Sequence, residues 1–254
     1  MTGRPVRAPA CAAAIAAAAL SACGGAAHAA AAVEPPTWAQ AFPTARAPER
    51  VRFEATYLGA DGRAHRLAVW RDGAQRLHRR TDARLDLYVS ADPQATGGLR
   101  LQVLDARRQA MVEVDRGNLM RIGVFVNWTT LAHVLAPPQA GARLEWLPDR
   151  PVPPDGPRCA WVRLRPARPP EAPLSRIAAA GAGARPPATD ICWSAAWGLP
   201  VEIRAAGTPD GTPPQFRLQS VAEIDADSAE LAPPSLPAAW GLVDANADLD
   251  PTRD

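Results

Sequence analysis

The sequence contains no lysine, and all 28 basic residues of its 254 are arginine, balanced by 26 acidic ones. No stripe of basic residues interleaved with aromatic ones occurs, which argues against a nucleic-acid partner. The sequence also lacks a Gly-x-Ser-x-Gly elbow, a His-Glu-x-x-His pair, a Walker loop and a dinucleotide fingerprint. The stretch from Asp244 to Asp250 begins like a calcium-binding loop but lacks its glycine and closing glutamate. We therefore predict a protein that is not an enzyme and holds no metal or cofactor.

No apolar run reaches the ~20 residues that a membrane-spanning helix needs. An Ala-rich stretch over residues 8–20 follows two arginines and ends in Leu20-Ser21-Ala22-Cys23. The charged start and short apolar stretch are typical of a secretory signal, and the last four residues resemble the bacterial lipobox. We expect residues 1–22 to be removed and Cys23 to carry diacylglycerol and a further chain such as palmitate. An uncleaved Ala-rich segment, or an ordinary signal cut near residues 29–30, is the alternative.

Lipid attachment would hold the protein at a membrane outside the cytoplasm. Two acyl chains anchor a protein stably, because each buried methylene contributes about 0.8 kcal/mol. Gly24, rather than an aspartate, follows the cysteine. By resemblance to other lipoproteins of Gram-negative bacteria, this favours the periplasmic face of the outer membrane. The mature chain has no net charge, because Arg4 and Arg7 are the only charged residues lost, leaving 26 arginines against 26 acids.

Only four cysteines occur, and two remain once Cys11 has left with the signal and Cys23 carries lipid. In an oxidising compartment the remaining pair, Cys159 and Cys192, is expected to form a disulfide. No Cys-x-x-Cys pair is present, so a structural role is favoured over a redox role. The two cysteines flank a Pro- and Ala-rich insert, residues 166–190, whose composition predicts disorder.

Composition divides the mature chain into a tether, a domain and a tail. Residues 23–48 are rich in Gly, Ala and Pro and are predicted to form a flexible tether, although Trp38 and Phe42 could dock on the domain. Residues 49–225 are predicted to form one β domain. Residues 226–254 are Pro-rich and acidic and are predicted to be a solvated tail.

Period-two alternation of apolar and polar residues predicts the strands of the domain. The first strand alternates from Val51 to Tyr57, and Asp61-Gly62 and Asp72-Gly73 are hairpin turn signals. Further strands are predicted at 65–71, 85–89, 99–103, 112–115, 118–122, 143–147, 159–165, 191–193, 201–204 and 216–224.

One helical signal interrupts this alternation. Asn127 is a good N-cap before an apolar stripe that runs from Trp128 to Leu135, and two prolines follow. We expect a short helix that lies across the sheet. His133 projects away from the apolar stripe and is expected at the surface.

A lipobox, a tether and a series of antiparallel strands with one helix midway resemble the LolA/LolB-like superfamily. This superfamily includes the RseB/MucB-type periplasmic stress regulators. The resemblance covers about residues 50–225, and its most specific part is Cys-Trp-x-x-x-x-Gly-Leu-Pro-Val-x-Ile, from Cys192 to Ile203, followed by a strand from Phe216 to Val221. It implies a mainly β fold, in which a curved antiparallel sheet forms an unclosed half-barrel. One or two short helices would cross the concave face.

The same resemblance implies a cavity for acyl chains on that concave face. A dry hydrophobic core is the alternative for the same positions, because periodicity does not distinguish a cavity wall from a packed interior. The implied cavity residues are Val51, Phe53, Leu85, Leu87, Leu99 and Leu101 in the sheet, with Trp128 and Leu131 on the lid.

The expected protein is a non-enzymatic outer-membrane lipoprotein that binds lipid or the acyl chains of another lipoprotein. Two alternatives belong to another class. The domain could be a scaffold or sensor that binds a periplasmic protein, or an accessory subunit of an envelope assembly.

Overall fold

The computed structural model describes residues 34–59, 61–121, 128–135, 137–138, 140–167, 187–209 and 211–245. The predicted signal peptide and lipid site at Cys23 lie outside these residues. So do most of the predicted insert, residues 168–186, and the chain after residue 245.

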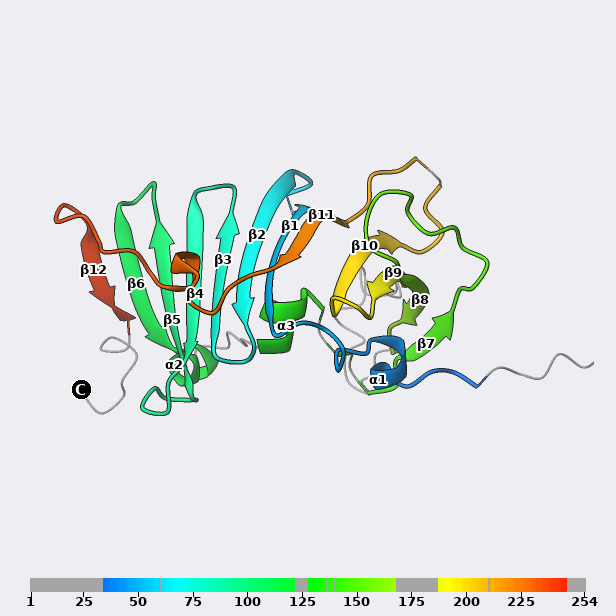
Figure 1. Ribbon diagram of the computed structural model, residues 1–254, viewed down its shortest axis with the longest axis horizontal. Helices are drawn as coiled ribbons and strands as arrows, with labels where there is room; N and C mark the ends of the chain where they lie inside the picture. Colours follow the sequence, from blue (N-terminus) through cyan, green and yellow to red (C-terminus); the bar gives the residue numbers. More distant parts are fainter. Residues whose placement is uncertain are drawn as a thin grey trace, which may run out of the picture. The chain divides into compact units, whose positions relative to one another are not determined.

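The described strands form one open sheet (Figure 1). Its spatial order is β12-β6-β5-β4-β3-β2-β1-β11-β10-β9-β8-β7, and β12 and β7 are its edges. The pairs are antiparallel except for β12 with β6, which is parallel. The strands are β1 Arg50–Leu58, β2 Ala64–Asp72, β3 Arg76–Thr81, β4 Leu85–Ala91, β5 Leu99–Asp105, β6 Ala110–Asp115, β7 Arg143–Trp146, β8 Ala160–Arg165, β9 Thr189–Ser194, β10 Leu199–Ala205, β11 Phe216–Glu223 and β12 Gly241–Asp244.

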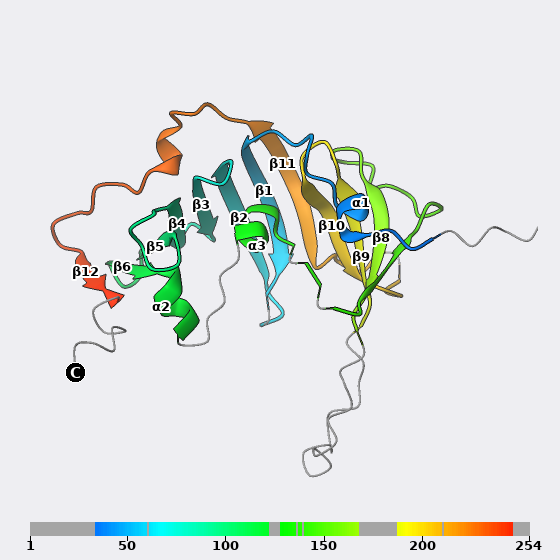
Figure 2. The same ribbon diagram turned by 90° about the horizontal axis from the view of Figure 1, so that it is seen from below.

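Short helices complete the described part of the chain: α1 Trp38–Ala41, α2 Arg116–Arg121, α3 Trp128–His133 and the 3-10 helix η1 Ala229–Leu231. In Figure 2, α2 and α3 lie on one side of the sheet, and the C-terminal segment with η1 runs along the other. The predicted fold class, a mainly β protein with an unclosed curved sheet and short helices, is confirmed.

Both predicted hairpin turns are present, because a glycine in each adopts the left-handed conformation that these turns require. Gly62 has φ +74° and Gly73 has φ +50°. The second turn leads into β3, which the sequence did not indicate. Both faces of β3 carry charged residues, so it shows no alternation of apolar and polar positions.

The predicted strand at 118–122 is wrong, because residues 116–121 form α2. The chain leaves the ladder after Asp115, where the Gly117 backbone N–H donates to the Thr96 carbonyl at 2.6 Å. Leu119 then packs against the core, while the neighbouring Met120 is exposed. A buried residue followed by an exposed one occurs both in strands and at the edge of a helix, so this pattern does not distinguish them. Here the turn at Gly117 is what starts a helix instead of a strand.

The inner face, defined as the side of the sheet that carries Val51 and Phe53, holds the main core. Ala132 of α3 is fully buried against this face. The largest cluster of buried residues also includes two residues of the outer face, because Trp161 and Cys192 lie in the same row as Glu202, Arg217 and Thr56. Its buried members are Val51, Phe53, Ala55, Leu67, Val69, Leu77, Val89, Leu101, Val114, Ala132, Trp161, Cys192, Leu199, Val201, Phe216 and Leu218.

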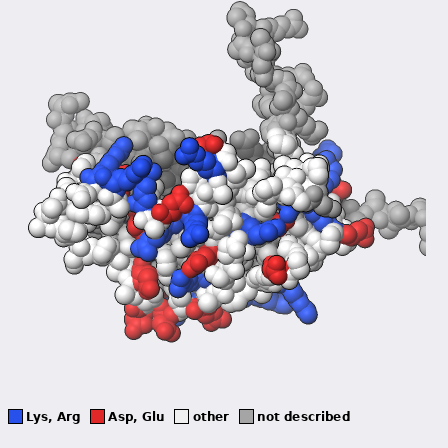
Figure 3. All heavy atoms as spheres, turned by 90° about the horizontal axis from the view of Figure 1, so that it is seen from above, with Lys and Arg blue, Asp and Glu red and all other residues white. Residues whose placement is uncertain are grey.

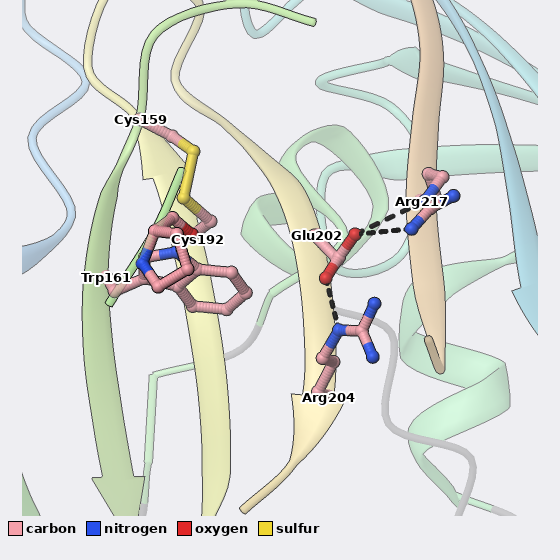
Figure 4. Close-up of a disulfide and its surroundings, with 7 residues drawn as sticks. Cys159, Trp161, Cys192, Glu202, Arg204 and Arg217 are labelled. Atoms are coloured by element: carbon pink, nitrogen blue, oxygen red, sulfur yellow. Dashed lines mark hydrogen bonds and ion pairs between the residues drawn. A yellow bond between two sulfur atoms is a disulfide. The ribbon is translucent and has the colours of Figure 1, made fainter. Parts of the chain in front are cut away.

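The outer face is covered at one end by the segment between β7 and β8, residues 147–159. Its backbone accepts a hydrogen bond at Pro151 from Trp161 Nε1, at 2.9 Å. Its end is fixed by the predicted disulfide, which is confirmed: Cys159 and Cys192 are bonded, with Cα atoms 5.4 Å apart (Figure 4).

The C-terminal segment runs along the other end of the outer face. Most of residues 226–245 are exposed, as predicted for a solvated tail, but the segment is docked through a few apolar residues and is not a free tail. Leu231 of η1 is 3% exposed, and Trp240 packs against a small cluster that includes Tyr88. The segment then adds β12 to the edge of β6. Its apolar side chains are too widely spaced in the sequence to show a period, which is why composition alone suggested a tail.

The prediction of a flexible tether is wrong for residues 37–48. Thr37 caps α1 in a reciprocal capping box with Gln40. Phe42 is 4% exposed and meets Trp193 edge-on, with ring centroids 5.3 Å apart. Trp193 Nε1 also donates to the Pro43 carbonyl at 3.1 Å. The structure therefore shows the alternative, in which Phe42 docks on the domain.

Two buried carboxylates on β9 and β10 are each held by two arginines. Asp190, predicted to lie in the disordered insert, instead belongs to β9 and is fully buried, bonded to Arg150 and, at 2.7 Å, to Arg163. Glu202 pairs with Arg204 and Arg217 beside the disulfide (Figure 4). The arginines compensate the charges of the two buried carboxylates, so burial of Asp190 and Glu202 is compatible with strands β9 and β10.

Reduction of the disulfide should lower the free energy of unfolding by about 4 kcal/mol. The chain-entropy model assigns about this value to a loop of this length, since the two cysteines are 33 residues apart. Urea unfolding with and without dithiothreitol measures the difference, and the double variant Cys159→Ala/Cys192→Ala serves as a control that reductant leaves unchanged. An unchanged midpoint with both thiols titrated as free would contradict the prediction.

Candidate ligand-binding site

A pocket of about 400 Å³ opens on the inner face, beyond the C-terminal end of α3. Its size lies at the lower end of the range for small-molecule sites, about 300–1,000 Å³. Most of the lining is apolar or aromatic, with one charged side chain. The lining residues are Tyr57, Leu58, Gly59, Leu67, Arg79, Val134, Ile203, Gln215 and Phe216.

Strand register brings the apolar wall together. Tyr57 of β1 is opposite Phe216 of β11, and Phe216 is in turn opposite Ile203 of β10. Residues opposite each other on antiparallel strands share a face. Three residues that are far apart in the sequence therefore form one continuous surface.

Val134 closes the pocket from the side of α3. Its φ of +59° lies in the left-handed region, which a β-branched residue adopts only under strain. Glycine is the usual residue directly after a helix in this conformation. Strained backbone is enriched at ligand sites, where the surrounding structure maintains it. The strain at Val134 therefore adds to the grounds for treating this pocket as the candidate site.

Arg79 is the charged residue of the pocket. It lies on the inner face of β3, between Val69 of β2 and Leu87 of β4, and it is partly buried. No hydrogen bond or ion pair joins its guanidinium to another residue of the described chain. The pocket thus combines an apolar wall with one uncompensated positive charge.

Arg71, two strand positions from Val69 on the same face, is 3% exposed and fastens α3 to the sheet. Its guanidinium donates to the Ala132 carbonyl at 3.0 Å and to the Pro48 carbonyl at 3.3 Å. Burial lowers the pKa of Arg71 to about 10, so the side chain is charged at neutral pH. Among the described residues no acid pairs with it, and these carbonyls solvate the charge instead.

His133, predicted at the surface, is the last residue of α3 and is partly buried, so that prediction is wrong. Its Nδ1 lies 2.7 Å from the Gly198 carbonyl and 3.0 Å from Arg71 Nη1. Burial lowers the pKa of His133, which the Gly198 carbonyl partly offsets and the charge of Arg71 reinforces. A neutral ring that donates from Nδ1 satisfies the Gly198 carbonyl. The contact with Arg71 is then not a hydrogen bond, because a protonated Nδ1 has no lone pair to accept one.

The eight residues predicted to line a cavity lie elsewhere on the inner side. Val51, Phe53 and Leu101 are buried core residues, Leu85 is 39% exposed, and Leu87, Leu99, Trp128 and Leu131 pack at the margin of the core. None is among the residues that line the pocket described here. The predicted strand residues lie on the side of the sheet that also carries this pocket, but alternation does not show where on that side the packed core ends.

Sequence reasoning also missed Arg79, Ile203 and Phe216 as site residues. The signal was present for the last two, because both belong to the late strands that carry the family resemblance. Arg79 gave no usable signal, since it stands in an arginine-rich strand.

A second pocket, of about 500 Å³, lies on the outer face and is lined mainly by residues of β1 and β2. Its lining mixes charges of both signs: Arg52, Arg66 and Arg80 with Glu54 and Asp82. Figure 3 shows the same interspersion of arginine and acidic side chains on one face of the molecule. This pocket offers no field of one sign for a charged ligand.

The described residues contain no group of three or more His, Cys, Asp or Glu side chains that could hold a metal ion. Three histidine–aspartate pairs occur among the described residues: His65 with Asp82 and His78 with Asp86, each at 2.6 Å, and His65 with Asp61 at 3.2 Å. The His65 ring donates to the carboxylates of Asp82 and Asp61, and these hydrogen bonds, that to Asp82 first, raise the pKa of His65. These pairs join neighbouring strands and turns and lie outside the lining of the inner pocket.

The chain matches no model of a known protein family and no curated protein. Within the described part of the chain, no helix is long and apolar enough to cross a membrane. The family resemblance therefore stays a prediction that rests on the sequence motifs.

Replacing Arg71 with methionine should lower the free energy of unfolding by about 2–4 kcal/mol, because it leaves the carbonyls of Ala132 and Pro48 without this donor. The matched variant Arg79→Met also removes an inward guanidinium, but one without partners, and should change stability by less than about 1 kcal/mol. Urea unfolding compares the two. Equal losses would contradict the role assigned to Arg71.

Proposed function

We propose that this protein is a non-enzymatic lipoprotein, anchored through Cys23 at the periplasmic face of the outer membrane, whose β domain binds an acyl chain of a lipid or of another lipoprotein. The observation that carries the binding function is the apolar pocket on the inner face. The anchor and the location rest on the lipobox and on Gly24.

Hydrophobic transfer supplies the driving force for binding. Each methylene that leaves water for the pocket contributes about 0.8 kcal/mol. Tyr57, Ile203 and Phe216 provide a wall for the chain, and Leu58 at the mouth is 46% exposed. Because Val134 follows α3 directly, movement of the end of this helix would widen the pocket, and release would need a partner or the membrane.

A second candidate function is binding of a periplasmic protein, as a scaffold, a sensor or an accessory subunit of an envelope assembly. Two observations favour it. Core side chains already fill most of the inner face, and apolar residues are exposed at both edges of the sheet. Trp146 on β7 is 36% exposed, and Leu242 and Val243 on β12 are 63% and 44% exposed. Exposed apolar surface of this kind is typical of protein contacts.

The anchor is tested by Cys23→Ser in a Gram-negative host supplied with labelled palmitate. The wild-type chain should incorporate the label and sediment with outer membranes, and the variant should do neither, because the thioether needs the cysteine sulfur. Cys11→Ser is the matched control and should behave as wild type. Labelling that survives in Cys23→Ser would contradict the proposed anchor.

The pocket is tested by native mass spectrometry on residues 24–254, purified without detergent and incubated with palmitate. The wild type should bind one chain. Ile203→Trp should weaken binding about tenfold or more, since the added ring fills the pocket and a loss of 1.4 kcal/mol corresponds to tenfold. Thr56→Trp, on the outer side of β1, is the matched control and should retain binding. An unchanged wild-type mass would overturn the proposed binding function.

A further inference from the structure

We infer that the ligand of the inner pocket is an anionic amphiphile with a single chain, whose carboxylate or phosphate head pairs with Arg79 while the chain lies against Phe216 and Ile203. This inference rests on the proposed acyl-chain binding. It adds the chemical class of the head group, which an apolar wall alone does not specify.

The first step is the unusual position of Arg79. Its neighbours across the strands, Val69 and Leu87, are apolar, and Phe53 and Val103 continue the same row. A guanidinium placed among apolar side chains loses hydration that nothing in the row replaces. The site therefore keeps a charged group where the fold itself would favour an apolar one.

The second step is the contrast with other arginines of this chain. Arg71, on the same face, is solvated by two carbonyls. Arg163 and Arg217 are held by buried carboxylates. Arg79 has no such partner in the described structure, so its charge is available to a ligand.

The third step is the composition of the lining. Apart from Arg79, the residues that line the pocket are uncharged, and only Tyr57 and Gln215 offer polar side chains. A cationic head group would find no carboxylate there and would be repelled by Arg79. An anionic head would gain a charge-assisted and bidentate contact, since the guanidinium fork matches carboxylate and phosphate.

The fourth step is the size of the pocket. About 400 Å³ lies near the lower limit for small-molecule sites. This suits one chain better than the several chains of a triacylated lipoprotein or a diacyl lipid. A fatty acid, or a lysophospholipid whose head has a net negative charge, thus fits both the volume and the charge.

The experiment uses residues 24–254 and three probes that share one chain: dodecanoate, dodecyl phosphate and dodecanol. Calorimetry should give dissociation constants for the two anions about tenfold lower than for dodecanol. Arg79→Met should remove this difference by weakening the anions and leaving dodecanol unchanged, and Arg79→Lys should restore part of it. Arg66→Met, which removes an exposed arginine of the outer pocket, is the matched control and should behave as wild type.

The possible outcomes separate this inference from the proposed function. Equal binding of the three probes to the wild type would leave chain binding intact and overturn the role of Arg79. No binding of any probe would overturn both. Inorganic phosphate is the probe without a chain, and binding of it as tight as that of dodecyl phosphate would show an anion site with no lipid component and overturn the inference. The ratio of dodecanoate to dodecyl phosphate affinity identifies which head the pocket prefers.

Discussion

Neither face of an open sheet is covered by a second sheet, and this constraint governs how the rest of the chain is used. The inner face is covered by short helices, and the segments after β7 and β11 cover the outer face. None of these segments is long enough to be stable alone. Each is fixed by a specific contact instead: Arg71 under α3, the disulfide at Cys159, and the buried side chain of Leu231 in η1.

The candidate site follows from the same constraint. The helix α3 covers the inner face up to His133. The next residue, Val134, has a strained backbone and lines the pocket. Arg71 and Arg79 lie on the same face, and their roles differ because α3 covers the first and not the second. Beneath the helix the guanidinium of Arg71 meets backbone carbonyls and stabilises the fold. Beside the pocket that of Arg79 meets apolar neighbours and is free to bind.

Much of the fold could be predicted from the sequence, because alternation over strands such as Val51 to Tyr57 reports which side is buried. The disulfide followed from counting cysteines. The missed features have other causes: β3 carries charge on both faces, α1 and η1 are too short to show a period, and β12 gains its place from pairing with β6. The pocket depends on long-range register, such as Tyr57 opposite Phe216, which one sequence does not encode locally.

The central claim is that an acyl chain occupies the inner face at the end of α3, and methyl NMR with palmitate tests it most directly. On a sample of residues 24–254 labelled at leucine, valine and isoleucine methyls, the account predicts shifts at Leu67, Val134 and Ile203. The buried core methyls of Val51 and Leu101 should not move. Shifts confined to the edge strands, at Leu242 and Val243, or no shifts at saturating palmitate, would contradict the claim.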